Sequence, residues 1–206
     1  MSKRDSQNRQ DARQPKDDEA EVTQSLHPGS PIPRQASAGS TMSVGDRLLQ
    51  YRILETLGRG GMGIVYLALD TVLDRLVAIK VLPERFTRDP AWITRLEEEA
   101  RVLASLNHPN IATIHGLETD ATARRFIVLE YIQGDSLAEV LRRGRLPVNR
   151  ALQTTRQIAL GLEAAHGRGL IHRDLTPRNV MIAQTGLVKI LDFGLARGER
   201  SPVHAG

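Results

Sequence analysis

The feature that most constrains this chain is a polar loop that stands directly before two short apolar strands in its C-terminal part. The loop begins at His172 and carries Asp174 and Asn179. The second strand, residues 188–191, leads into Asp192 of an Asp-Phe-Gly sequence. Phosphoryl transfer requires a carboxylate that orients an attacking hydroxyl group, together with hard oxygen ligands for Mg²⁺. The pattern therefore indicates phosphoryl transfer, although either motif alone also fits an ordinary polar turn.

The composition is that of a globular protein with room for one sizeable core. Of the 206 residues, 40% are hydrophobic and 25% are charged, and none is cysteine, which excludes disulfides and thiolate metal sites. The N-terminus lacks the apolar stretch of a signal peptide, and no apolar run approaches membrane-spanning length. We therefore expect a cytoplasmic protein without a membrane segment. The net charge of +4 is spread along the chain, which argues against a nucleic-acid partner, and no oligomeric state is predicted.

The first 45 residues differ in composition from the rest of the chain. They are rich in Ser, Gln, Asp, Arg and Pro and contain few large apolar side chains. Such a segment cannot bury enough surface to offset its loss of conformational entropy on folding. We expect a disordered polar tail over residues 1–45.

A glycine-rich hairpin is predicted at the start of the folded part. Two strand-like runs, residues 51–57 and 64–69, flank the segment that contains Gly58, Gly60 and Gly63. In a dinucleotide-binding fold this glycine pattern would open a helix, but the β-branched residues that follow favour a strand. The backbone of such a hairpin can approach phosphate groups because no Cβ intervenes. The alternative is a flexible hairpin without a ligand.

A buried lysine and a helical glutamate are predicted to form an ion pair. Lys80 stands among apolar residues in a predicted strand, residues 76–82, where a lysine rarely remains without an anionic partner. The alternative is an edge strand from which the lysine reaches water. The next helix, predicted from residue 90 to about 106, places Glu99 on its apolar stripe. The other members of that stripe are Trp92, Leu96, Leu103 and Leu106.

The remaining elements are predicted from their periodicity. Residues 111–116 and 125–131 read as strands, and the segment from Gly134 opens a short helix. Residues 148–168 read as a longer helix that leads into the polar loop. One face of this helix is predicted to carry Ala151, Thr155, Ile158, Leu162 and Ala165.

Five signals thus occur in one order: the glycine hairpin, the strand lysine, the helix glutamate, the His-Arg-Asp loop and the Asp-Phe-Gly turn. Together, over residues 51–197, they resemble the protein kinase family, and the residues of the motifs are most similar to those of bacterial Ser/Thr kinases of the eukaryotic type. The resemblance implies an α+β, two-lobed fold. The N-lobe, residues 46–132, would hold an antiparallel sheet plus one helix. The C-lobe, residues 133–206, would be helical and incomplete.

The resemblance also implies transfer of the γ-phosphate of ATP to a Ser or Thr of a protein substrate, with Mg²⁺ as cofactor. Asp174 would orient the hydroxyl group, and Asn179 and Asp192 would hold the metal. The residues implied for ATP are Gly58, Gly60, Gly63, Val65, Ala78, Lys80 with its partner Glu99, Glu130, Ile132 and Met181. A hydrophobic stack between the lobes would contain Leu103, Ile114, His172 and Phe193.

Three points remain open at the level of sequence. Family members of the Ser/Thr type carry Lys two residues after the catalytic Asp, whereas this chain has Thr176 there and Arg178 two residues later, so either could contact the γ-phosphate. The ribose contact is open between Asp135 and Ser136. The sequence ends fourteen residues after Asp192, so we expect a truncated product. The alternative functions are a catalytically impaired nucleotide-binding or regulatory module and, less compatible with these motifs, a small-molecule phosphotransferase.

Overall fold

The computed structural model describes residues 41–193, and all structural statements below concern this range. Its first residues already belong to the folded part. Met42 is 3% exposed, and its backbone N–H donates a hydrogen bond to the hydroxyl group of Tyr66 at 3.1 Å. The predicted tail over residues 1–45 therefore extends too far, because a single buried methionine does not alter the polar composition from which the tail was predicted.

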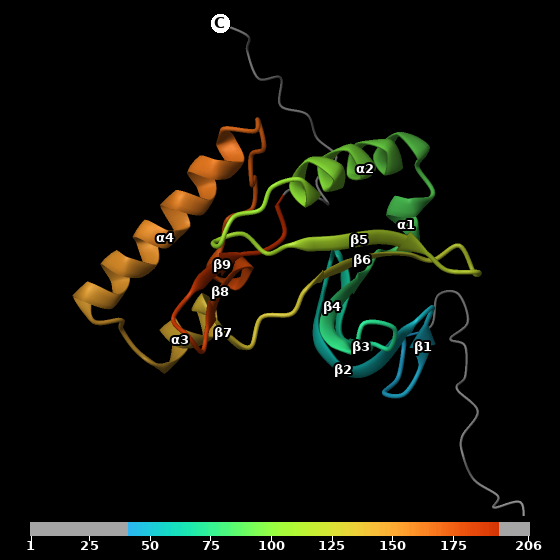
Figure 1. Ribbon diagram of the computed structural model, residues 1–206, viewed down its shortest axis with the longest axis horizontal. Coiled ribbons are helices and arrows are strands. Elements are labelled where there is room, and N and C mark those ends of the chain that lie inside the picture. Colours follow the sequence, from blue (N-terminus) through green and yellow to red (C-terminus); the bar gives the residue numbers. More distant parts are fainter. Residues whose placement is uncertain (1–40, 194–206) are drawn as a thin grey trace, which may run out of the picture. The chain divides into compact units, whose positions relative to one another are not determined.

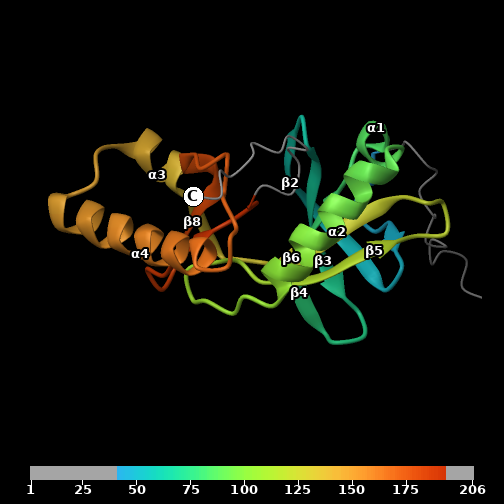
Figure 2. The ribbon, with the colours of Figure 1, turned by 90° about the horizontal axis from the view of Figure 1, so that it is seen from above.

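The N-lobe contains a six-stranded sheet in which all neighbouring strands are antiparallel, as predicted (Figure 1). Helix α2 packs against this sheet on the side of β5 (Figure 2). The strand order is β1 (Arg47–Leu48), β2 (Tyr51–Gly60), β3 (Gly63–Asp70), β4 (Arg75–Val81), β6 (Arg125–Glu130) and β5 (Ile114–Thr119), and the helices are α1 (Glu84–Thr87) and α2 (Pro90–Ala104).

The glycine hairpin is formed by β2 and β3, so the strand predicted after Gly63 is confirmed. Gly63 has a φ of +119°, and a Cβ built there would lie 2.0 Å from the carbonyl oxygen of Val81. Only glycine avoids that collision and adopts that φ without strain. Gly63, the first residue after the turn of the hairpin, therefore lies directly against the end of β4.

Helix α2 begins where the sequence provides a cap. The side chain of Asp89 accepts a hydrogen bond from the N–H of Ala91 at 2.9 Å, and Pro90 occupies the first turn. The predicted stripe is confirmed, with buried side chains at Trp92, Leu96, Ala100 and Leu103. Glu99, at the edge of this stripe, is only partly buried.

The C-terminal part contains a small sheet, β7 (Gly134–Ser136), β8 (Val180–Ala183) and β9 (Val188–Ile190), with helices α3 (Leu137–Arg143) and α4 (Val148–His166) and the 3₁₀ turn Pro177–Asn179. The short helix predicted to open at residues 134–137 is confirmed, but residues 134–136 first pair with β8 as a strand that the sequence analysis did not predict. A Cβ at Gly134 would lie 2.1 Å from the carbonyl oxygen of Ile182, so the glycine permits this close pairing. The helix begins only after Ser136.

The buried face of α4 differs from the predicted one at Thr155, which is exposed. Ala165 is buried as predicted, and Thr154 and Gly161 are buried as well. A Cβ at Gly161 would lie 2.9 Å from Cδ1 of Ile190 and 3.0 Å from the carbonyl oxygen of Asn110. The helix thus approaches β9 through a glycine, which an apolar periodicity does not count.

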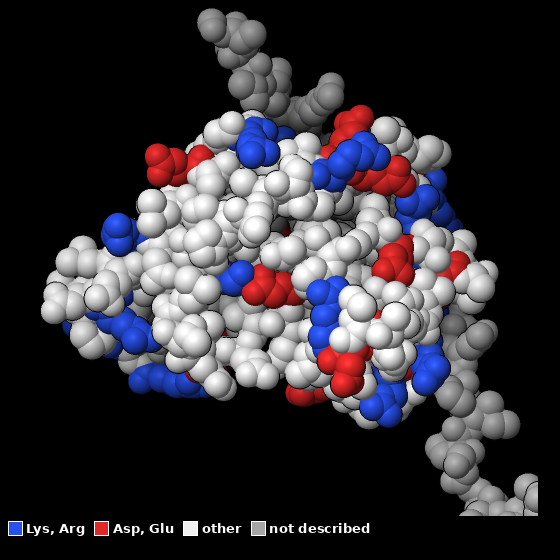
Figure 3. Space-filling model, in the orientation of Figure 1, with Lys and Arg blue, Asp and Glu red and all other residues white. Residues whose placement is uncertain are grey.

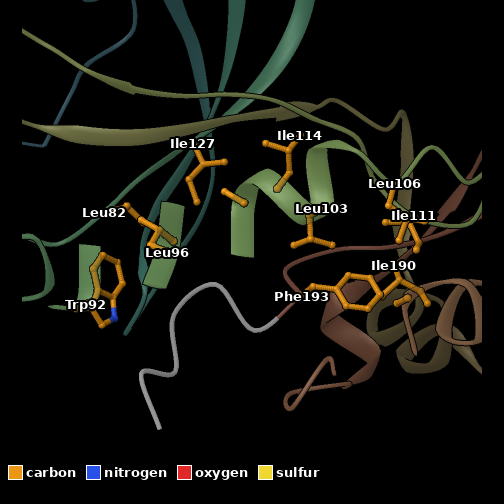
Figure 4. Packing of buried hydrophobic residues seen from close by; sticks show 12 residues of the cluster. Leu82, Trp92, Leu96, Leu103, Leu106, Ile111, Ile114, Ile127, Ile190 and Phe193 are labelled. Carbon is orange, nitrogen blue, oxygen red and sulfur yellow. The ribbon is translucent and has the colours of Figure 1, made fainter. Parts of the chain in front are cut away.

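One apolar cluster contains residues of both lobes (Figure 4). It includes Leu103 of α2 and Ile114 of β5 together with Ile190 and Phe193 from the C-terminal part. The ring of His172 lies 4.8 Å from that of Phe193, centroid to centroid. The four residues predicted to form a stack between the lobes therefore lie together in the structure.

Strand β5 begins three residues later than predicted, because residues 110–112 are bound to β9 instead. The N–H of Ala112 donates to the carbonyl oxygen of Ile190 at 2.9 Å, and the N–H of Ile190 donates to that of Asn110 at 2.9 Å. The segment between α2 and β5 is thus bonded to the C-terminal part.

Candidate active site

A cavity of about 1090 Å³ lies between the glycine hairpin and the polar loop after α4. On the face seen in Figure 3, acidic and basic side chains meet at a hollow near the centre. The volume is slightly above the usual range for small-molecule sites, about 300–1,000 Å³. All predicted site residues except Glu99 line this cavity: Gly58, Gly60, Gly63, Val65, Ala78, Lys80, Glu130, Ile132, Asp174, Thr176, Arg178, Asn179, Met181 and Asp192.

The first two glycines of the hairpin, Gly58 and Gly60, are not required by the packing of the described residues. A Cβ built at Gly58 or Gly60 would meet no atom within 4 Å, and neither residue has a positive φ. Both residues line the cavity. The open space beside them fits a ligand that approaches the backbone closely, which is how a glycine-rich loop covers phosphate groups.

The polar loop is fixed by a buried histidine. His172 is 2% exposed, and its Nε2–H donates to the carbonyl oxygen of Leu191 at 2.8 Å. Its Nδ1 accepts the backbone N–H of Asp174 at 3.2 Å. Arg173, between them, has a φ of +59°, an uncommon value for a side chain of this size. The histidine therefore positions Asp174 relative to the end of β9.

The two predicted metal ligands are brought together by a backbone hydrogen bond. The N–H of Leu191 donates to the carbonyl oxygen of Asn179 at 2.8 Å, so Asp192 is adjacent to Asn179. The amide nitrogen of Asn179 donates to the carbonyl oxygen of Asp174 at 2.9 Å. Its amide oxygen accepts no hydrogen bond from any described residue.

This donor set fits Mg²⁺ better than a transition metal. It offers a carboxylate from Asp192 and an amide oxygen from Asn179, and both are hard ligands. The described residues contain no group of three or more His, Cys, Asp or Glu placed to hold a metal. Mg²⁺ commonly uses one or two protein oxygens and completes its shell with water and substrate phosphates.

Lys80 and Glu99 do not form the predicted ion pair. Lys80 Nζ lies 2.8 Å from Oδ2 of Asp192, and Glu99 Oε1 lies 3.4 Å from Nη1 of Arg173. Lys80 is 4% exposed, so it requires a nearby carboxylate, and Asp192 supplies it. The Lys80 pair joins the N-lobe sheet to the Asp-Phe-Gly motif, and the Glu99 pair joins α2 to the His-Arg-Asp motif.

Glu99 keeps a partly desolvated carboxylate in this arrangement. Burial raises its pKa above the usual value, while the positive charges of Arg173 and Arg95 lower it by less. Glu99 does not line the cavity. The predicted role of Glu99 as the partner of Lys80 therefore requires a change from the arrangement in the structure.

Of the two candidates for the ribose contact, Asp135 and Ser136, the cavity favours Ser136. Asp135 binds Arg143 through two hydrogen bonds of 2.6 and 2.9 Å, and these lower the pKa of its carboxyl group. Asp135 does not line the cavity, whereas Ser136 does. The Ser136 hydroxyl group and backbone N–H bind Glu139, which also lines the cavity and which the sequence analysis missed. The Ser-x-x-Glu spacing of a capping box was the available signal.

Thr176 and Arg178 both line the cavity, so the structure does not choose between them. The carbonyl oxygen of Thr176 accepts the N–H of Asn179 at 2.9 Å and closes the turn. The exposed Arg178 forms no ion pair with any described residue.

No helix in the part of the chain that the structure describes is long and apolar enough to cross a membrane.

The comparisons with known proteins agree on one family. The family model described as "Protein kinase domain" matches residues 51–205. The chain is 42% identical over 160 residues to serine/threonine-protein kinase PknA of Mycobacterium tuberculosis, and the aligned region covers 75% of this chain and 37% of PknA. It is 41% identical over 150 residues to the probable serine/threonine-protein kinase PknB of Lactococcus lactis, covering 72% and 24%.

Solved structures give the same result. The crystal structure of the Mycobacterium tuberculosis PknI kinase domain superposes with a TM-score of 0.66 at 30% identity, covering 76% of this chain and 64% of that domain. Rad53, solved in complex with AMP-PNP, has a TM-score of 0.62 at 31% identity, covering 71% and 38%. The chain thus spans less than two fifths of the two curated relatives named above and slightly under two thirds of the PknI domain.

Proposed function

The chain belongs to the protein kinase family, among bacterial Ser/Thr kinases of the eukaryotic type, and on that premise we propose that it transfers the γ-phosphate of ATP to a Ser or Thr hydroxyl group of a protein. The observation that carries the proposal is that Asp174, Asn179 and Asp192 line one cavity together with Lys80 and the glycine hairpin. The complex of the related Rad53 with AMP-PNP supports a nucleotide as the ligand.

Each group has a distinct task in the proposed reaction. Asp174 accepts a hydrogen bond from the substrate hydroxyl group and orients it toward the phosphate. The ammonium group of Lys80 binds the phosphates of ATP and neutralises part of their charge. Asn179 and Asp192 hold Mg²⁺. When bound, the metal neutralises charge on the phosphate oxygens.

The hairpin and the hinge are proposed to hold the nucleotide in place. Gly58 and Gly60 allow backbone N–H groups to cover the phosphates. The adenine lies between apolar side chains, and its edge is bound by the backbone around Glu130 and Ile132, in the hinge that connects β6 to β7. Holding the γ-phosphate near an oriented hydroxyl group converts an encounter of two molecules into a step within one complex.

A phosphotransfer assay with ATP and a protein or peptide rich in Ser and Thr tests the proposal. We expect phosphoserine or phosphothreonine to form with Mg²⁺ and to be absent with EDTA. Nucleotide binding, measured in parallel by titration calorimetry, separates the two candidate functions. Tight Mg²⁺-dependent binding of ATP without transfer to any acceptor would favour the nucleotide-binding regulatory module over the kinase.

Replacing Arg178 with alanine is expected to lower transfer more than replacing Thr176 with alanine. A phosphoryl transition state carries charge that a guanidinium group stabilises, whereas a hydroxyl group supplies only a weaker dipole. By comparison with removal of one preorganised donor, the loss for Arg178→Ala is about 10²-fold in kcat. Rescue of Arg178→Ala by Thr176→Lys would support relocation of the charge, and unchanged transfer by Arg178→Ala would refute it.

A further inference from the structure

A third ion pair joins the N-lobe to the C-terminal part at the hinge. The hinge here means residues 130–133, which connect β6 to β7. Lys189 Nζ, on β9, lies 2.7 Å from Oε2 of Glu130, the last residue of β6. The two side chains are 12% and 29% exposed, so this pair is shielded from water far more than the surface pair Arg88–Glu84, at 79% and 52%. The pair therefore carries more interaction energy than an exposed one.

The same carboxylate has a second partner, and the backbone of Glu130 is bound as well. Oε2 of Glu130 accepts the N–H of Thr113 at 3.1 Å, and the N–H of Glu130 donates to the carbonyl oxygen of Thr113 at 2.9 Å. Lys189 Nζ also reaches the carbonyl oxygen of Ile111 at 3.5 Å. Both the side chain and the main chain of Glu130, the first hinge residue, are thus bound to the segment before β5.

The strand that carries Lys189, β9, is fixed by buried side chains and by hydrogen bonds to Asn110 and Gln157. On either side of Lys189, Val188 and Ile190 are fully buried, as strand alternation requires when Lys189 points the other way. The Asn110 side chain donates to the carbonyl oxygen of Val188 at 2.8 Å and to Oε1 of Gln157 at 3.1 Å. Gln157 Oε1 in turn accepts the N–H of Val188 at 2.9 Å. Helix α4 therefore holds β9 where Lys189 meets the hinge.

We propose that Lys189 is a positioning residue that holds the hinge, through the carboxylate of Glu130, in the arrangement that reads the adenine edge. This inference rests on the proposed function, because it assigns Lys189 to the same nucleotide site. Lys189 does not line the cavity and acts only through Glu130. Its effect is therefore on the base and not on the phosphates.

The test compares two ligands, adenosine and Mg²⁺-ATP, on the full chain and its Lys189→Met variant. Because the hinge contacts only the base, both dissociation constants are expected to rise by the same factor, about 3- to 10-fold, where tenfold corresponds to 1.4 kcal/mol. Lys189→Arg keeps the charge and is expected to restore both affinities to within about twofold. Glu130→Gln is expected to match Lys189→Met, and the double variant to bind no more weakly than the worse single one.

Arg88→Met is the matched control, since it removes a cation from an exposed ion pair outside the cavity, and it is expected to leave both affinities unchanged. A loss confined to Mg²⁺-ATP would place the effect at Asp192, three residues after Lys189, and would overturn the proposal. So would unchanged binding by Lys189→Met, or failure of Lys189→Arg to restore it. Thermal unfolding of each variant identifies any that fail to fold, and Glu130→Gln then gives the decision. A wild-type chain that binds neither ligand would refute the proposed function, and the inference with it.

Discussion

Replacing Asp174 with asparagine is expected to lower the rate of phosphate transfer by about 10²- to 10⁴-fold, the range for loss of a positioned acid–base group. The affinity for Mg²⁺-ATP is expected to stay within about threefold of wild type, because the proposed contact of Asp174 is with the acceptor hydroxyl group and not with the nucleotide. Asparagine has the same shape but presents a weaker acceptor and no negative charge.

The loop geometry makes a structural collapse by this variant an unexpected outcome. Asn179 donates its shorter hydrogen bond, 2.9 Å, to the main-chain oxygen of residue 174, and the contact with the side-chain oxygen is 3.4 Å. The bond from the backbone N–H to His172 also involves no side-chain atom of Asp174. These main-chain bonds remain in Asp174→Asn, so Asn179, the proposed metal ligand, keeps its position.

Single-turnover phosphotransfer and nucleotide titration on the same preparation measure the two effects separately. Asp74→Asn is a suitable control, since Asp74 lies exposed in a turn and has a φ of +48°, a value that asparagine tolerates. It is expected to change neither quantity. Equal losses of binding and transfer in Asp174→Asn would assign Asp174 to the nucleotide and contradict its role at the acceptor.

The sequence predicted best what depends on neighbours along the chain. The strand after Gly63 follows from β-branched residues, and the stripe of α2 follows from a helical repeat that begins at a capped N-terminus. The position of Asp174 also follows from local chemistry, because His172 binds it across only two residues. Each of these features is encoded within a single turn, strand or helix.

Features that depend on the approach of distant segments could not be predicted in this way. The buried face of α4 is set by Gly161 fitting against Ile190, and β7 exists because Gly134 lets the chain approach β8. An apolar periodicity assigns neither glycine a role. The partner of Lys80 is likewise decided by how the two lobes meet, since its sequence environment shows only that some carboxylate is required.

Lys80→Met is expected to lower phosphate transfer on the order of 10²- to 10³-fold, the range found when one preorganised donor to a developing charge is removed. The affinity for ATP is expected to fall as well, because Lys80 is proposed to contact the phosphates in the ground state. In the structure the same ammonium group is bound to Asp192, so the nucleotide must compete with a carboxylate for it.

Two double-mutant cycles separate the partner seen in the structure from the partner predicted from the sequence. In the nucleotide-free chain, Lys80→Met and Asp192→Asn are expected to be coupled by about 1–3 kcal/mol in the free energy of unfolding, since the two groups are in contact. Asparagine tolerates the φ of +52° at residue 192, so the cycle reports the ion pair and not backbone strain. Lys80→Met and Glu99→Gln are expected to be additive in stability, because Glu99 pairs with Arg173.

The second cycle is expected to give a different result when phosphate transfer is measured. If Lys80 leaves Asp192 for the nucleotide phosphates, Asp192 becomes available to Mg²⁺, and Glu99 must leave Arg173 to support Lys80. Loss of either Lys80 or Glu99 then removes the same arrangement, so the double variant is expected to transfer phosphate no more slowly than Lys80→Met alone. Fully additive losses in transfer would mean that Glu99 never becomes the partner of Lys80. Coupling in stability between Lys80 and Glu99 would mean instead that their pair already forms without nucleotide, contrary to the ion pairs in the structure.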